Sequence, residues 1–292
     1  LPLSWCYRFI LWLKHTMYQL GILKPYRADV PVWVVGNLTV GGTGKTPVVI
    51  ALAIWLKDQG HHPGIISRGY GGTHSTKTPV MVPAQGDPRQ FGDEPILLAK
   101  KTGCPVAIGT KRAVVIRFLR RRHQQINIIL SDDGLQHDAI AQDYRIAIID
   151  GQLGLGNGHL LPLGPLREPI YRLKTMNAVL YRDPPSHRET TLPTFSIRPE
   201  PIHNLVNPNR LLTPNDLKNK TIHAVAGIGN PNHFFRTLSY LGYKITPHAF
   251  SDHHNFRPSD LAFGSESIII MTEKDAVKCR PLCDGRCWVL PV

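Results

Sequence analysis

The sequence predicts an α/β fold in which a mainly parallel sheet is flanked by helices, followed by a second, smaller α/β domain. From residue 30 onward, short apolar runs rich in β-branched residues alternate with helix-like segments through short connections. Such alternation is typical of a parallel sheet covered by helices on both sides. The composition, 42% apolar and 19% charged, is that of an ordinary globular protein. An amphipathic helix is expected to precede the first strand.

The first unit is expected to end in a long loop that is rich in glycine and proline. Its expected strands are residues 30–38, 63–67, 104–109, 126–130 and 144–150. Its expected helices are residues 46–60, 94–102 and 111–124. Polar loops cover residues 69–92 and 151–169. Loops of this length in compact domains often carry function.

The composition changes around residues 183–186, which read Asp-Pro-Pro-Ser and suggest a linker. A smaller unit follows, with strands expected at residues 221–228, 243–250 and 267–272 and helices at 231–241 and 258–263. We therefore expect an N-terminal helix in residues 1–28, a larger domain in 29–185 and a smaller domain in 186–292.

The first 24 residues are rich in Leu, Ile, Trp and Tyr, and charged residues interrupt every run long enough to span a bilayer. Wound as a helix, they place polar side chains on one stripe: Ser4, Arg8, His15 and Gln19. The remaining surface is apolar and aromatic. This pattern fits a helix that lies in a membrane interface, and it equally fits a helix packed on the protein's own core. A cleaved signal fits less well because no small-residue cleavage site follows.

A glycine-rich loop joins the first expected strand to the first expected helix. It reads Thr39, Val40, Gly41, Gly42, Thr43, Gly44, Lys45 and Thr46. Thr39 stands where the pattern Gly-x-x-x-x-Gly-Lys-[Ser/Thr] has its first glycine. The three glycines allow positive φ and inward-pointing amides, and the helix N-terminus adds partial positive charge. Lys45 can reach the β- and γ-phosphates of a nucleotide, and the Thr46 hydroxyl suits Mg²⁺. The loop predicts a P-loop NTPase-like fold.

Two adjacent carboxylates follow the strand expected at residues 126–130. Asp132 and Asp133 come directly after Ser131 and precede Gly134. Carboxylates at the carboxyl end of a strand beside the phosphate loop suit Mg²⁺, which keeps phosphate and water oxygens as its other ligands. An Asp-Gly turn is the alternative when this segment is considered alone. Which of the two carboxylates ligates the metal directly stays open.

Other classes of nucleotide-binding protein fit less well. An Asn-Lys-x-Asp element, which GTPases use to read the base, is absent from the sequence, and Val40 replaces the lysine of partitioning ATPases. The formal net charge of +13 implies an anionic partner, but the sequence contains no recognisable nucleic-acid module. Three cysteines recur every fourth residue without Cys-x-x-Cys spacing, so reduced thiols are expected rather than a metal cluster: Cys279, Cys283 and Cys287.

Seven blocks distributed along the chain are shared, in order, with one known family. They are GNLTVGGTGKTP (36–47), SRGYGG (67–72), GDEP (92–95), SDDGLQH (131–137), LPLGPLREP (161–169), DHH (252–254) and TEKDAVK (272–278). The sequence resembles the tetraacyldisaccharide 4′-kinases, also called lipid A 4′-kinases. The phosphate loop of that family also lacks the first glycine.

This resemblance implies an ATP- and Mg²⁺-dependent kinase. It would transfer the γ-phosphoryl group to the 4′-hydroxyl of tetraacyldisaccharide 1-phosphate and yield lipid IVA. The protein would be peripheral, at the cytoplasmic face of the inner membrane, with an anionic membrane surface as partner. Withdrawing acyl chains from a bilayer costs about 0.8 kcal/mol per CH₂, so the enzyme would work at the interface. That requirement favours the membrane interpretation of residues 1–24.

The resemblance also assigns roles to single residues. Asp93 resembles the catalytic base and His253 its histidine partner, with His254 as the alternative partner. From the pattern alone, Asp93 resembles the start of a helix. Arg112 and Arg167 resemble residues that contact phosphate. The block at 272–278 has no clear role, and we expect a structural one.

Two other functions remain possible from the sequence. One is a P-loop ATPase that couples hydrolysis to nucleic-acid binding, and the other is a kinase for a small metabolite. The lipid kinase should consume ATP only when its lipid acceptor is present. The ATPase should instead be stimulated by DNA or RNA.

Overall fold

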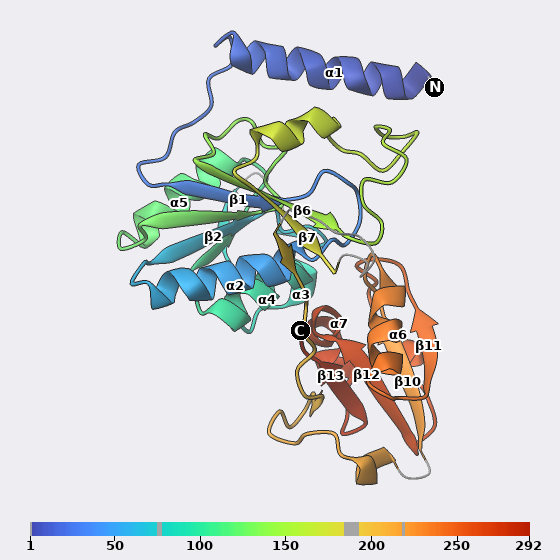
Figure 1. The fold of residues 1–292 in the computed structure, drawn as a ribbon. Coiled ribbons are helices and arrows are strands. Elements are labelled where there is room, and N and C mark those ends of the chain that lie inside the picture. Colours follow the sequence, from blue (N-terminus) through green and yellow to red (C-terminus); the bar gives the residue numbers. More distant parts are fainter. Residues whose placement is uncertain (1, 75–77, 184–192, 218–219) are drawn as a thin grey trace.

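The computed structural model describes residues 2–74, 78–183, 193–217 and 220–292, in two domains (Figure 1). In the described part of the chain, the larger domain contains an 8-stranded sheet and the smaller domain a 5-stranded sheet. The helix α1 (Pro2–Gln19) lies across the end of the larger domain that faces away from the smaller one (Figure 1). The predicted fold class is confirmed.

The larger sheet has the strand order β3-β4-β2-β5-β1-β6-β7-β8. Its strands are β1 (Val32–Gly36), β2 (Pro63–Ser67), β3 (Val80–Met81), β4 (Val106–Ile108), β5 (Ile128–Asp132), β6 (Tyr144–Asp150), β7 (Ala178–Arg182) and β8 (Thr194–Phe195). Among the described strands of this sheet, β3 pairs antiparallel with β4 and the other pairs are parallel. Val35 of β1 pairs with Asp132 of β5. The phosphate loop and the two carboxylates therefore emerge at the same edge.

Helices cover both faces of this sheet. They are α2 (Lys45–Asp58), α3 (Pro88–Phe91), α4 (Asp93–Thr102), α5 (Arg112–Arg122) and the 3₁₀ helix η1 (Ile170–Thr175). Successive residues of β1 point to opposite faces, as a strand requires. Val34 packs in a core with side chains of α5, and Val35 packs in a second core with side chains of α2 and α4. A strand buried on both faces explains the uninterrupted apolar run that predicted it.

The smaller domain has the strand order β11-β10-β12-β13-β9. Its strands are β9 (His203–Asn204), β10 (Thr221–Ala226), β11 (Ile245–Ala249), β12 (Ser267–Thr272) and β13 (Cys287–Leu290). Its helices are α6 (Pro231–Tyr240) and α7 (Glu273–Cys279), with 3₁₀ turns η2 (Pro214–Leu217), η3 (Pro258–Leu261) and η4 (Arg280–Leu282). Phe234 and Leu238 of α6 pack against the sheet. The five cysteines of the chain carry free thiols.

Several elements differ from those expected. The loop predicted at residues 69–92 contains β3 and α3, and the helix predicted at 258–263 is the short turn η3. β3 and α3 are too short for a periodic pattern to reveal. Residues 184–186 of the predicted linker lie outside the described residues, whereas β8 still pairs with β7 in the larger sheet. The domain boundary at residue 185 stays a prediction.

The helix α1 packs on the larger domain through Ser4 and Leu11, which are buried, whereas Arg8 and Gln19 of the predicted polar stripe are exposed. Ser4 Oγ donates a hydrogen bond to the Leu160 carbonyl at 3.0 Å, and Tyr7 Oη donates to the Arg167 carbonyl at 2.9 Å. Large apolar side chains are exposed on the other side: Leu3, Trp5, Phe9, Ile10, Trp12 and Leu13. Leu11 is buried in a core of the larger domain and Tyr7 packs against that core, so one side of the helix packs on the protein as the second interpretation expected, while the membrane contact of the exposed side stays a prediction. Within the described residues, no helix is both long and apolar enough to cross a bilayer.

Candidate active site

The phosphate loop connects β1 to α2 with the conformation that its glycines permit. Gly41 and Gly44 have φ of 108° and 87°, in the left-handed region that favours glycine. Gly42, which we expected to share this conformation, does not. The helix begins at Lys45, so its free amides point toward the loop. The local geometry therefore suits an anion at the N-terminus of α2.

A second loop positions the first residues of the phosphate loop. Thr39 forms an antiparallel bridge with Leu166, and the Val40 amide donates to the Pro165 carbonyl at 2.8 Å. This pairing explains why the sequence tolerates threonine in place of the first glycine. Thr39 is not among the residues that line the cavity described below, so its predicted contact with a nucleotide stays a prediction. Val40 does line it.

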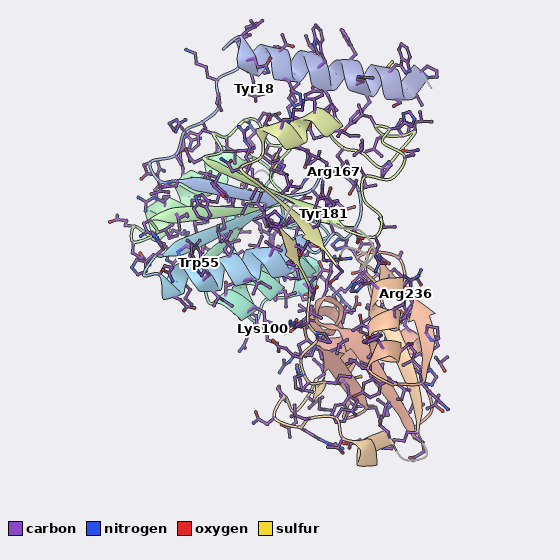
Figure 2. All side chains as sticks on the ribbon, viewed as in Figure 1. Tyr18, Trp55, Lys100, Arg167, Tyr181 and Arg236 are labelled. Atoms are coloured by element: carbon purple, nitrogen blue, oxygen red, sulfur yellow. The ribbon has the colours of Figure 1, made fainter. Side chains whose placement is uncertain are left out.

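The pairing also brings Arg167 beside the phosphate loop, on the side of the larger domain that lies under α1 (Figure 2). One Arg167 nitrogen donates to both carboxylate oxygens of Asp133, at 2.9 and 3.0 Å. Lys45 Nζ lies 3.1 Å from Asn37 Oδ1 and 3.8 Å from Asp133 Oδ1. Burial tends to raise the pKa of Asp133, but the nearby Lys45 and Arg167 lower it below its ordinary value. Asp133 is thus held by two cations.

Asp132 has different surroundings. It is 2% exposed, and its Oδ1 has no hydrogen-bond partner among the described residues. Burial, together with the negative charges of Glu94 and Asp133, raises the pKa of Asp132 to about 7. A buried carboxylate oxygen without a donor fits a divalent cation, which also stabilises the ionised form. Within the described residues, no cluster of three His, Cys, Asp or Glu side chains could hold a metal, so Mg²⁺ needs phosphate oxygens and water as further ligands.

Arg112 is buried against the same strand end. It is 3% exposed, and its guanidinium donates to the carbonyls of Asp132 at 3.2 Å and Gly109 at 3.5 Å. Burial lowers the pKa of Arg112 to about 10, although the carboxylates of Asp132 and Asp133 oppose this shift. The side chain keeps its positive charge at neutral pH and fixes the backbone that carries Asp132.

A cavity of about 560 Å³ extends from the phosphate loop to the smaller domain. Residues 40–46, Arg112, Asp132, Asp133 and Arg167 line it from the larger domain, and Gly229, Asn230 and His253 from the smaller one. Apolar side chains contribute a further part of the wall: Ile50, Ile197, Phe234 and Leu290. Its volume lies within the range of small-molecule sites, and its cationic and apolar parts match the phosphates and the base of a nucleotide.

Asp93 and His253 meet across the domain interface. His253 Nδ1 lies 3.1 Å from Asp93 Oδ1, although 160 positions separate the two residues in the sequence. Asp93 is the first residue of α4 and is almost fully buried, while Gly92 occupies the cap position. Burial tends to raise the pKa of Asp93, but the hydrogen bond from His253 and the nearby Lys274 and Lys278 lower it overall. The carboxylate is therefore ionised at neutral pH.

The histidine next in sequence has another partner. His254 Nε2 lies 3.0 Å from Asp260 Oδ2 and does not contact Asp93. His253 has φ of 58°, and its ring contacts Tyr70 edge-on at 4.9 Å. This left-handed backbone conformation is uncommon outside glycine and turns the imidazole toward α4. Of the two histidines that the sequence left open, the structure brings His253 to Asp93.

The model of the tetraacyldisaccharide-1-P 4′-kinase family matches residues 1–292 of the chain. The chain belongs to this family. It is 43% identical to the tetraacyldisaccharide 4′-kinase of Methylobacillus flagellatus over 295 residues, covering 100% of this chain and 86% of that one. It is 42% identical to the enzyme of Coxiella burnetii over 291 residues, covering 100% and 85%. For the enzyme of Dechloromonas aromatica the identity is 44% over 299 residues, covering 100% and 86%.

The fold also resembles the crystal structure of LpxK from Aquifex aeolicus in complex with ATP. The TM-score is 0.79 at 30% identity, with 99% of this chain and 91% of that chain covered. The family, the kinase activity, the use of ATP and the P-loop NTPase-like fold predicted from the sequence are confirmed. Mg²⁺ fits this kinase family, and it also fits the unpartnered carboxylate oxygen of Asp132 described above.

Sequence reasoning missed several residues that line the nucleotide cavity of this kinase. Arg182, at the end of β7, is 6% exposed and pairs with Asp150 Oδ2 at 2.6 Å. Gly44 lies so close to Arg182 that an added Cβ would approach its Cδ to 3.0 Å. His137 is neutral at pH 7, because burial and the charge of Arg112 lower its pKa to about 4. The blocks around 67–72 and 131–137 could have indicated Tyr70 and His137, but no local pattern marks Arg182.

Proposed function

We propose that this kinase transfers the γ-phosphoryl group of ATP to the 4′-hydroxyl of tetraacyldisaccharide 1-phosphate, with the lipid held at the cytoplasmic face of the inner membrane. The observation that carries the proposal is the Asp93–His253 pair, which joins the two domains at the cavity that the phosphate loop lines. The cavity joins both features, because His253 and Lys45 line it together. Phosphoryl transfer needs a donor and an acceptor hydroxyl to meet in this way.

Lys45 and the amides of the phosphate loop bind the β- and γ-phosphates in this proposal. Thr46 and Asp132 would hold Mg²⁺, which neutralises charge on the transferring phosphoryl group when bound. Arg167 and Lys45 keep Asp133 in place, and Arg112 fixes the strand end through the Asp132 carbonyl. Arg167 lines the cavity together with the phosphate loop, which supports a contact with a phosphate group.

Asp93 and His253 act together as the base that accepts the proton of the sugar hydroxyl. Of the two, His253 lines the nucleotide cavity, and Asp93 lies behind it in the described structure. A carboxylate that accepts from one imidazole nitrogen orients the ring and favours its protonated form. The negative charge of the buried carboxylate therefore supports proton acceptance by the pair.

The activity is tested by transfer of labelled γ-phosphate from ATP to the disaccharide lipid. The wild-type protein should label the lipid, and Lys45→Ala should lower the rate by at least about a hundredfold, because one charge-stabilising group is lost from the transition state. Asp133 would also lose one of its two cationic neighbours. ATP hydrolysis that is stimulated by DNA or RNA, with no labelling of the lipid, would contradict the proposal.

The outward side of α1 supports a membrane contact. Trp5 and Trp12 are 75% and 54% exposed, on a helix whose opposite side is hydrogen-bonded to the protein. Tryptophan at headgroup depth and apolar side chains below it are typical of interfacial helices. Because α1 contacts the Arg167 backbone, a lipid headgroup bound under the helix would lie near the phosphate loop.

Replacing Trp5 and Trp12 together with aspartate should weaken binding to anionic vesicles by at least about tenfold, since the burial of a large apolar side chain contributes about 1.5–3 kcal/mol. Vesicle flotation measures this effect. Trp55→Asp is the matched control, because Trp55 is 51% exposed on α2, on the other side of the larger sheet (Figure 2). Equal flotation of the double variant and the wild type would refute the anchor.

A further inference from the structure

The block at residues 272–278, whose role the sequence left open, forms α7 at the domain interface. Thr272 caps the helix by accepting a hydrogen bond from the Asp275 amide at 3.1 Å. Lys274 and Lys278 are four residues apart and thus lie on one side of the helix. Both lysines approach the Asp93–His253 pair, whereas neither residue of that pair belongs to α7.

Lys278 lies buried beside Asp93. Its Nζ lies 3.6 Å from Asp93 Oδ2 and 2.8 Å from Asp275 Oδ1, and its side chain is 9% exposed. Asp275 is fully buried, and its other oxygen accepts from the Gly227 amide at 2.9 Å and the Thr272 hydroxyl at 2.7 Å. The ion pair with Asp275 therefore places the ammonium group beside Asp93 from the smaller domain.

The two oxygens of Asp93 have unequal partners. Oδ1 accepts from the Glu94 amide at 2.9 Å and faces His253 Nδ1 at 3.1 Å. Oδ2 has no hydrogen-bond partner among the described residues, and Lys278 provides a positive charge on that side. A buried carboxylate is costly without such compensation. Lys278 thus supplies the positive charge that compensates Asp93 Oδ2.

Lys274 acts on the other member of the pair. Its Nζ lies 3.3 Å from His253 Nε2 and also contacts Glu94 at 3.0 Å. An ammonium group can only donate, so Nε2 of the neutral imidazole accepts and Nδ1 carries the hydrogen that faces Asp93. This tautomer keeps a basic nitrogen at Nε2 and directs the ring toward the carboxylate.

We propose that Lys278, together with Lys274, is a positioning residue of the transfer reaction that holds the Asp93–His253 pair in the arrangement able to accept the acceptor's proton. This inference rests on the proposed roles of Asp93 and His253. Lys278 is the informative member, because it lines a separate cavity of about 190 Å³ with Asp93 and His253 and not the nucleotide cavity. A change at Lys278 therefore leaves the nucleotide contacts intact.

The effect on pH dependence has a definite sign. The charged groups around the pair are Glu94 on α4, Asp252 beside His253, and Lys274, Asp275 and Lys278 on α7, and Asp87 and Arg89 line the smaller cavity. Activity falls as pH drops through the apparent pKa of the pair, because the base becomes protonated. Removing the Lys278 charge makes the protonated form more favourable. The acid limb of the profile of kcat against pH must then move to higher pH.

The experiment measures kcat for transfer to the disaccharide lipid as a function of pH. Lys278→Met should move the acid limb upward by about one to two units, the usual effect of one opposite charge at this range, with the KM for ATP unchanged. Lys278→Arg should return the limb toward the wild-type position. If Lys278→Met does not fold, Lys278→Gln answers the same question while keeping a donor toward Asp275.

Lys101→Met is the matched control. Lys101 pairs with Glu273 at 2.6 Å and so also joins α4 to α7, but no contact with Asp93 or His253 is found among its described interactions. The control should leave the acid limb in place. An equal loss of activity at every pH in Lys278→Met, or an equal shift in Lys101→Met, would overturn the inference. A wild-type protein that labels no lipid at any pH would instead mean that the proposed function has failed.

Discussion

Replacing Asp93 with asparagine is expected to lower kcat by about 10²- to 10⁴-fold, the range that one acid–base group contributes to catalysis. Asparagine keeps the size of the side chain and removes the charge that His253 faces at 3.1 Å. The pair then loses its ability to accept the hydroxyl proton. Affinity for ATP should stay within about twofold, because binding of the β- and γ-phosphates is assigned to the phosphate loop and Lys45.

Steady-state transfer to the lipid gives kcat, and an equilibrium titration with ATP gives the affinity. Asp260→Asn is the control, because Asp260 forms a similar pair with the neighbouring His254 at 3.0 Å, away from Asp93. Its kcat should stay near that of the wild type. A loss of ATP affinity as large as the loss of kcat would contradict the assignment of Asp93 to the proton-accepting base.

Asp132→Asn is expected to raise the Mg²⁺ concentration needed for half-maximal activity and to lower the maximal rate by about a hundredfold or more. Even residues that only support metal ligands typically change metal affinity or activity 10- to 100-fold, so a direct ligand should matter at least as much. The structural reason is the buried Asp132 Oδ1, which has no hydrogen-bond partner among the described residues.

Asp133→Asn should behave differently, since Arg167 and Lys45 hold this carboxylate. Loss of the Asp133 carboxylate frees Arg167 and Lys45 from their shared partner. The variant should therefore change ATP affinity more than Mg²⁺ dependence. Titrations of activity against Mg²⁺ at saturating ATP separate the two variants. If only Asp133→Asn shifts the Mg²⁺ requirement, the assignment of the two carboxylates must be exchanged.

Local patterns in the sequence predicted much of the larger domain. The apolar runs became β1, β2, β4, β5 and β6 of the parallel sheet, because strands buried on both faces need continuous apolar stretches. Other elements were missed: the strands β3, β7, β8, β9 and β13, and the helices α3 and α7. The last of these is amphipathic over only two turns, and its lysines pair with groups distant in the sequence.

The orientation of α1 could not be predicted for a related reason. The polar stripe was visible in the sequence, but a helix with one polar and one apolar side can face the protein with either. Ser4 and Tyr7 bind the carbonyls of Leu160 and Arg167, two groups that a distant loop brings beneath the helix. Tertiary packing therefore decided which side of α1 faces the protein, and that side includes the apolar Leu11 as well as Ser4.

By itself the sequence determined that the chain carries a nucleotide phosphate loop at Gly41–Thr46, since such a loop is one short stretch whose glycines, lysine and helix start act locally. It also indicated the family through seven blocks in order. Only the tertiary structure decided that His253 rather than His254 meets Asp93, that Asp132 keeps an unpartnered oxygen while Asp133 is paired, and that Lys278 stands beside the buried carboxylate. The first and third depend on the contact between two domains and the second on packing within the larger domain, and residues near one another in sequence encode neither.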